Sequence, residues 1–297
     1  MLLQAIHQLP RHGKGRWAID GTIEDNQHVL VVSLIVGRRA VPMYGRAYDA
    51  SVLQGRMKRY ELAVIRRAVG RVIQAVGKRR VMVTADRGVA AVARFSWLNE
   101  LGMAFMIRVK AGTHVYVQGQ WRKWGQLTFR RHERHRSFGA LPYGERCPQA
   151  LWVSKSRARD RNGNWGIGHL VANRPYDARK AAQEYGRRFG CEEGFRDATW
   201  WLGFAKARSA QIKAWSRMFA LFALALLVMT SLGSQLLLAP ARGALHLLRR
   251  VASRRRGRCE LGLIRAMVSL LKQDKTLYHK LCPHAKLRLE ATLANVS

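Results

Sequence analysis

Closely spaced cysteines are missing from this sequence of 297 residues. The cysteines that it has lie far apart and form no Cys-x-x-Cys pair: Cys147, Cys191, Cys259 and Cys282. A zinc ribbon needs such pairs, so their absence excludes that class and indicates a reducing compartment. The short apolar run at the start has no basic segment before it, unlike a signal peptide. We therefore expect a cytoplasmic protein.

Acidic residues are also scarce. The chain has 53 Lys and Arg against 18 Asp and Glu, which gives a formal net charge of +35. The basic runs are spread over the whole length, and any one of them is most simply a solvated face. Together they exceed what solubility requires and indicate a polyanion as partner, with nucleic acid as the first candidate and an anionic membrane as the second.

The apolar content, 48%, is enough to fill a sizeable core. Residues 1–110 predict three antiparallel strands, then a helix over Met57–Val76, a strand over 81–85, a second helix and a fifth strand. This order predicts an α/β fold with a mixed sheet flanked by helices. In open sheets of this kind, functional residues gather at the ends of strands.

The rest of the chain divides into three predicted segments. Residues 111–175 contain short strand-like pieces between turns and predict a β-rich insertion in the main domain. Residues 176–240 predict a further helical part of that domain, and residues 241–297 a basic helical tail. Between Met218 and Pro240 there is no charged residue. This stretch is either a buried core helix, broken near residues 230–234, or a membrane span.

Three acids are candidates for one site. Asp20 and Asp86 each close an apolar strand-like run, and Glu192 lies in a basic helical stretch. On a continuous helix, offsets of three, four and four put the following side chains on one face: Tyr185, Arg188, Glu192 and Arg196. Each acid also has an ordinary alternative, namely a turn residue for Asp20, a helix cap for Asp86 and a surface ion pair for Glu192.

Carboxylates that meet in space would suit one kind of chemistry. Cleavage of a phosphodiester by two divalent ions needs a small set of acids that converge on the ion pair. Oxygen ligands favour magnesium or manganese over zinc. In so basic a chain, an acid at the end of an apolar strand is informative, and the hypothesis is that the three acids form such a site.

Four motifs follow one another in this order: Ala18-Ile-Asp-Gly-Thr22, Val83-Thr-Ala-Asp-Arg-Gly88, Phe105-Met-Ile-Arg-Val-Lys110 and Tyr185-x-x-Arg188-x-x-x-Glu192. With these motifs the chain resembles the DDE transposases of bacterial insertion sequences and, more narrowly, the insertion-sequence-four group. The resemblance covers about Arg16 to Leu238. It implies a ribonuclease H-like sheet with a β-strand insertion between the second and third acids.

The resemblance also implies a function for the site. Asp20, Asp86 and Glu192 would be the catalytic residues and the ligands of two Mg²⁺ or Mn²⁺ ions. Tyr185 and Arg188 would contact DNA near the cleaved end. Water would attack at the transposon boundary, and the freed 3′ hydroxyl would then attack target DNA. The implied partners are transposon ends and target DNA, bound by a homodimer, with no role for a membrane.

Two departures from the family pattern lead to further expectations. The motif has a lysine seven residues after the glutamate, where this chain has Thr199. Arg196 or Lys206 is then the substitute phosphate contact. Few residues precede Asp20, so the end-binding region of the family has no obvious counterpart here. Either the chain is an N-terminally truncated or inactive copy, or the specificity for transposon ends comes from elsewhere in the chain or from a partner. The alternatives are a non-catalytic basic protein that binds nucleic acid and a membrane-associated protein.

The predicted insertion contains Trp121, Trp124 and Trp165. These side chains either stack on an unpaired base or pack a small β core, which is the usual role of aromatic residues in sheets.

Overall fold

The computed structural model describes residues 15–24, 27–36, 39–88, 90–130, 132–145, 149–159, 163–201, 211–238, 253–255 and 258–260. The chain divides into two compact units, and the boundary lies between Glu192 and Glu193. The predicted boundaries at residues 110, 175 and 240 stay predictions.

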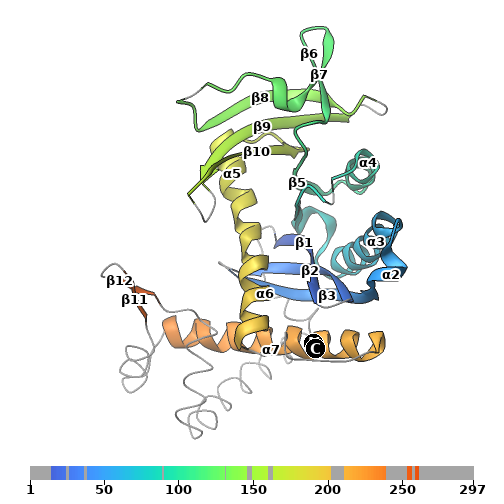
Figure 1. Ribbon diagram of the computed structural model, residues 1–297, viewed down its shortest axis with the longest axis vertical. Coiled ribbons are helices and arrows are strands. Elements are labelled where there is room, and N and C mark those ends of the chain that lie inside the picture. Colours follow the sequence, from blue (N-terminus) through green and yellow to red (C-terminus); the bar gives the residue numbers. More distant parts are fainter. Residues whose placement is uncertain are drawn as a thin grey trace, which may run out of the picture. The chain divides into compact units, whose positions relative to one another are not determined.

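A mixed sheet of ten strands forms most of the first unit (Figure 1). Its first five strands are β1 (Gly15–Glu24), β2 (Gln27–Val36), β3 (Arg39–Asp49), β4 (Val81–Ala85) and β5 (Ala104–Arg108). The other five are β6 (His114–Val117), β7 (Gln120–Lys123), β8 (His135–Tyr143), β9 (Gln149–Arg159) and β10 (Trp165–Ala172). The order across the sheet is β3-β2-β1-β4-β5-β10-β9-β8-β6-β7. β4 runs parallel to β1 and to β5, and the other pairs are antiparallel.

Helices cover both faces of this sheet. On one face, α3 (Met57–Val76) and α4 (Val92–Glu100) pack on a core that includes Trp17, Val83 and Phe105. On the opposite face, α5 (Ala178–Gly186) packs through Ala181 on Met82, Met106 and Leu170 of β4, β5 and β10. Because both faces are covered, the central strands β4 and β5 are apolar along nearly their whole length. The predicted mixed α/β sheet flanked by helices is confirmed.

Shorter elements connect these parts. α2 (Ala50–Leu53) begins at Asp49, whose side chain accepts a hydrogen bond from the Ser51 backbone N–H. The α5 helix begins in the same way at Asp177, which accepts from the N–H groups of Arg179 and Lys180. Two 3-10 turns, η1 (Lys78–Arg80) and η2 (Trp124–Gln126), precede β4 and follow β7.

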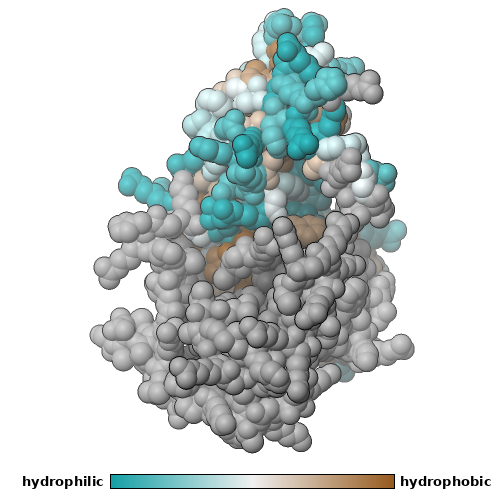
Figure 2. Space-filling model, turned by 90° about the vertical axis from the view of Figure 1, so that its left-hand side faces the viewer, coloured by the Kyte–Doolittle hydropathy of each residue, from teal (hydrophilic) through white to brown (hydrophobic). Residues whose placement is uncertain are grey.

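The strands from β6 to β10 extend the main sheet, because β10 pairs with β5. β8 was not predicted from the sequence, because it contains Gly139 and Pro142, but it pairs with β9 along its length. Figure 2 shows that the surface of the described residues in this part is mainly hydrophilic. The β-rich character predicted for this stretch agrees with these strands.

The second unit contains α7 (Ile212–Leu238), a helix that continues through residues 230–234. The predicted break there is therefore wrong, since the small and polar residues of this stretch keep helical backbone. Among the described residues, the stretch Ile212–Met229 is long and apolar enough to cross a membrane, with a mean hydropathy of 1.7 over 18 residues. A core helix of a soluble protein also meets this criterion.

Most of the predicted helical tail lies outside the described residues. The parts that are described, β11 (Ser253–Arg255) and β12 (Arg258–Glu260), form a two-stranded antiparallel sheet. For these six residues the helix prediction is wrong. Hydrogen bonds between these two short strands take the place of the helix that the leucine pattern of the segment predicts.

The imidazole of His169 gives a pH prediction for the fold. Its ring lies 5.8 Å from the Trp124 ring, and burial, aided by the charges of Lys155 and Arg108, lowers the pKa of His169 to about 4. Between that value and its ordinary pKa, the unfolded chain binds the proton and the folded chain does not. The free energy of unfolding should therefore fall as the pH drops from about 6.5 to about 4, by about 1–2 kcal/mol because solvent screens this half-buried ring.

Urea denaturation of the wild type and of His169→Gln at a series of pH values measures this step. The variant should lose it, whereas His132→Gln, at an exposed turn position, should keep it. Equal pH dependence in the wild type and His169→Gln would contradict the assignment.

Candidate active site

Adjacent strands place two of the predicted acids side by side. β1 and β4 are parallel, and their register pairs Ile19 with Ala85, so Asp20 and Asp86 follow at neighbouring positions. Asp86 comes directly after β4, as predicted. Asp20 does not close its strand, because β1 continues to Glu24. Beyond Ile19, β1 has lost β4 as its neighbour but still pairs with β2.

The predicted continuous helix around Glu192 is instead three short pieces. α5 ends at Gly186, the 3-10 turn η3 (Arg187–Phe189) follows, and α6 (Gly190–Trp201) begins at once. Gly186 and Gly190 flank the turn, and glycine weakens a regular helix. Tyr185, Arg188 and Glu192 nevertheless lie close to Asp20 and Asp86. The 3-10 turn is tighter than an α-helix, but the chain continues through it in the same direction.

Arg188 joins two of the predicted acids. Its Nη1 donates to Asp20 Oδ2 at 2.6 Å, and its Nη2 donates to Glu192 Oε1 at 3.2 Å. The Arg188 side chain is only 9% exposed. Its Nε is buried and has no hydrogen-bond partner within the described part of the chain. A buried donor of this kind costs about 1–3 kcal/mol and is satisfied if an anionic oxygen reaches it.

Tyr185 binds the third acid. Its hydroxyl donates to Asp86 Oδ1 at 3.1 Å, and the Arg188 guanidinium lies 5.6 Å from the centre of its ring. Arg108, at the end of β5, brings Nη1 to 4.0 Å from the same Asp86 oxygen. The sequence reasoning assigned no role to Arg108. Its signal was present, since parallel β4 and β5 end together and their register pairs Ala85 with Ile107.

The charges of these groups affect one another. Burial raises the pKa of Asp20, and the negative charge of Asp86 raises it further, while Arg188 and the Gly21 N–H oppose this. Burial also raises the pKa of Tyr185 to about 12, so its hydroxyl stays a hydrogen-bond donor. Although burial acts to lower it, interaction with Tyr185, Asp20 and Asp86 raises the pKa of Arg188. Arg188 is therefore a permanent cation between acids.

A second ion pair attaches α5 to β1. Arg16 donates through Nε and Nη2 to both carboxylate oxygens of Glu184, the second of these bonds being 3.0 Å long. Arg16 lies four residues before Asp20, and Glu184 four residues before Arg188. The two elements are thus fixed at two points, which positions Arg188 against Asp20. Sequence reasoning missed this pair because its members are 168 residues apart.

Other predicted residues have different surroundings. Arg196 belongs to the second unit and donates from Nη1 to Glu193 at 3.1 Å. Its DNA contact stays a prediction, as does any role of Thr199 in α6. Lys206 lies outside the described residues.

The three tryptophans of the insertion separate by exposure. Trp124 is fully buried, which agrees with packing, and Trp121 meets Tyr116 edge to face at 5.4 Å. Trp165 is 53% exposed. Of the three, Trp165 is the most accessible to a base.

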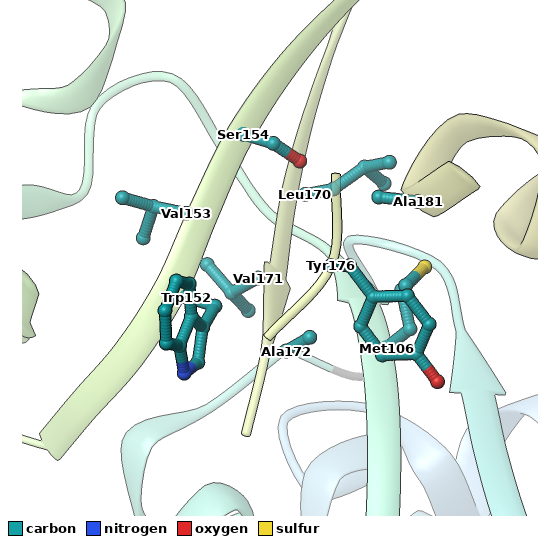
Figure 3. A pocket seen from close by; sticks show the side chains of 9 residues that line it. All are labelled: Met106, Trp152, Val153, Ser154, Leu170, Val171, Ala172, Tyr176 and Ala181. Atoms are coloured by element: carbon teal, nitrogen blue, oxygen red, sulfur yellow. The ribbon is translucent and has the colours of Figure 1, made fainter. Parts of the chain in front are cut away.

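A cavity of about 240 Å³ opens beside the acids. Asp20, Asp86 and Gly88 line one part of it, and α3 lines another through residues that include Glu61 and Ile65. A second, much smaller space of about 10 Å³ lies between β5, β9, β10 and α5 (Figure 3). That space holds one water at most and is lined by none of the predicted site residues. Of these two spaces, the larger cavity is the one that can admit a substrate to Asp20 and Asp86.

The acids suit a hard divalent cation in their chemistry. Asp20, Asp86 and Glu192 offer oxygen donors alone, which magnesium and manganese prefer. The repulsion between Asp20 and Asp86 is what a divalent cation would relieve. No three His, Cys, Asp or Glu side chains in the described ranges lie close enough to hold one ion. In this arrangement Arg188 supplies the positive charge to Asp20 and Glu192.

A comparison with models of protein families identifies a family for this chain. Residues 55–228 match the model of a family described as "Transposase DDE domain". The matched residues include Asp86 and Glu192 and begin after Asp20. A search of the curated proteins finds no match to this chain.

The Arg16–Glu184 pair should stabilise the fold measurably. A double-mutant cycle with Arg16→Met and Glu184→Gln should give a coupling energy of about 1–3 kcal/mol, because the pair is bidentate and partly buried. Arg187 is the matched control, since its Nη2 lies 3.7 Å from the same carboxylate but its side chain is 48% exposed. Its coupling to Glu184 should stay below about 0.5 kcal/mol.

Chemical denaturation of the single and double variants measures both couplings. Equal values for Arg16 and Arg187 would show that the first pair does not attach α5 to β1.

Proposed function

Since the chain belongs to the family of transposase DDE domains, we propose that it cleaves DNA at the ends of an insertion sequence and joins those ends to target DNA. The observation that supports this most is the meeting of Asp20, Asp86 and Glu192, from three separate segments, around Arg188 and Tyr185. The chain has few acidic residues, and solubility does not require that three of them lie close together.

Asp20, Asp86 and Glu192 are the proposed ligands of two Mg²⁺ or Mn²⁺ ions. When bound, such ions lower the pKa of an attacking water or hydroxyl and neutralise the charge on the leaving oxygen. Glu192 is the most exposed of the three, at 42% of its side chain, and can reorient without moving the sheet. Asp20 and Asp86 are fixed by the strands and define the position of the reaction.

Tyr185 and Arg188 are the proposed contacts to the phosphate beside the cleaved bond. Arg188 has a planar fork of donors that matches phosphate oxygens, and its buried Nε has no hydrogen-bond partner in the described part of the chain. When a phosphate approaches, its oxygens compete with Asp20 and Glu192 for the guanidinium. Substrate binding would thereby free carboxylate oxygens at the same time.

The proposed reaction has two phosphoryl transfers. First, the oxygen of water attacks the phosphorus at the transposon boundary, the bond from phosphorus to the 3′ oxygen breaks, and a free 3′ hydroxyl results. That hydroxyl then attacks a phosphorus of the target strand and displaces its 3′ oxygen. No covalent bond to the protein forms, so the residues only bind, orient and stabilise charge.

The finer assignment is also a proposal. The Tyr185, Arg188 and Glu192 motif supports the insertion-sequence-four group, and the sheet order around β1, β4 and β5 supports a ribonuclease H-like core. The strands from β6 to β10 correspond to the β-rich insertion. We further propose cytoplasmic action on DNA by a homodimer.

A non-catalytic basic protein that binds DNA is the second candidate. Two observations favour it. Arg188 forms ion pairs with Asp20 and Glu192 where a metal ion would bind, and no three-residue metal cluster is present in the described part of the chain. An inactive copy of a transposase would have this property.

Substitution of the acids separates the two candidates. Asp20→Asn, Asp86→Asn and Glu192→Gln should each lower magnesium-dependent cleavage by at least about 100-fold, because loss of a direct ligand costs more than loss of its supporting partner. Binding to the same duplex should change little. Glu193→Gln is the matched control beside Glu192 and should keep its activity.

The assay uses a duplex made from the DNA that flanks the chain's own gene, and it follows cleavage and binding separately. Cleavage that survives in all three variants would show that these acids are not the ligands. Binding without cleavage by the wild type would support the second candidate.

A further inference from the structure

The outer side of α3 is strongly basic. Five of its side chains are exposed cations, called here the α3 basic face: Lys58, Arg59, Arg66, Arg67 and Arg71. None of them forms an ion pair with an acid in the described part of the chain. The single acid of this helix, Glu61, binds Arg94 of α4 at 2.8 Å instead. The positive charge of α3 is therefore not neutralised within the described structure.

This charge pattern opposes the stability of the helix. Lys58 and Arg59 lie in the first turn, which contains no acid, although the first turn favours negative charge. Arg67 and Arg71 are four residues apart, a spacing at which like charges destabilise a helix by about 0.2–0.5 kcal/mol. Selection for the helix alone would not place cations in these positions. A polyanionic partner explains them.

The shape of the α3 basic face suits a phosphate backbone. Ala63 and Gly70 are small, exposed residues among the cations, and the space beside Gly70 is open. From Arg59 to Arg71 the helix rises by about 18 Å, enough to face several successive phosphates. Arg66 and Arg71 also lie over Trp97 and Tyr44, at 5.7 Å and 5.9 Å from the ring centres. These contacts reduce the freedom of both guanidinium groups before a ligand binds.

The same helix reaches the candidate active site. Met57, Glu61 and Ile65 of α3 line the cavity that Asp20 and Asp86 also line. A DNA backbone that lies along the exposed side of α3 would therefore pass close to the entrance of this cavity. The alternative polyanion, an anionic membrane, has no such relation to the acids.

We propose that the α3 basic face binds the phosphate backbone of duplex DNA, without reading its sequence, and holds the duplex whose strand enters the cavity. This inference rests on the proposed function, because it makes the face an extension of the active site. It assigns a surface on the catalytic unit itself to general DNA binding.

The salt dependence of DNA binding tests the proposal. Anisotropy of a labelled duplex of arbitrary sequence gives the slope of log affinity against log salt between about 50 and 200 mM. Changing Arg59, Arg66, Arg67 and Arg71 together to Gln should reduce the steepness of this slope by about 3–4, at about 0.9 per phosphate contact. The matched control changes four exposed cations elsewhere, namely Lys123, Arg174, Arg179 and Lys180, to Gln. Its slope should change by less than about 1.

Each outcome decides. An unchanged slope in the α3 variant, or an equal change in the control, would overturn the proposal. The proposal would also fail if the α3 variant lost binding to anionic phosphatidylglycerol vesicles but kept its binding to DNA. The α3 variant should remain folded by circular dichroism, since Gln is nearly as good a helix former as Arg and the repulsion is removed. If the wild type shows the α3-dependent slope but no magnesium-dependent cleavage, the proposed function fails and the surface stands.

Discussion

The guanidinium of Arg188 is the point on which the candidate site depends. It binds Asp20 on β1 and Glu192 on α6, and it lies over the ring of Tyr185, which binds Asp86 after β4. Burial and, to a smaller extent, the charge of Asp86 raise the pKa of Asp20, and Arg188 opposes both effects. Arg188 thus joins its own segment to β1, and Tyr185 joins that segment to the end of β4.

The fold supplies the support that this cation needs. The parallel pair of β1 and β4 sets the two aspartates side by side, and α5 is attached to the sheet by its apolar face and by the Arg16–Glu184 pair. A chain with so few acids uses several of them here. In the described part of the chain its cations lie mostly exposed, as on α3, where they are available to a polyanion. The distribution of charge therefore separates a small acidic site from a broad basic surface.

Much of this site was predictable from sequence, for physical reasons. Asp86 follows a fully buried apolar strand, and Tyr185, Arg188 and Glu192 have spacings that hold even through a 3-10 turn. What sequence could not give was long-range pairing. The partnership of Arg16 with Glu184 depends on tertiary packing, and β8 is a strand because β9 and β6 pair with it. The helix is interrupted at η3 because Gly186 and Gly190 weaken a regular helix. α7 is unbroken because its backbone stays helical through residues 230–234.

Diffraction from crystals grown with manganese and a short DNA duplex decides whether Asp20, Asp86 and Glu192 bind the catalytic ions. Anomalous scattering locates manganese independently of any model of the protein. The account predicts manganese bound by the carboxylates of Asp20, Asp86 and Glu192, with Arg188 turned from these acids to a DNA phosphate. Manganese bound elsewhere, or Arg188 still paired with Asp20 and Glu192 while DNA is bound, would contradict it.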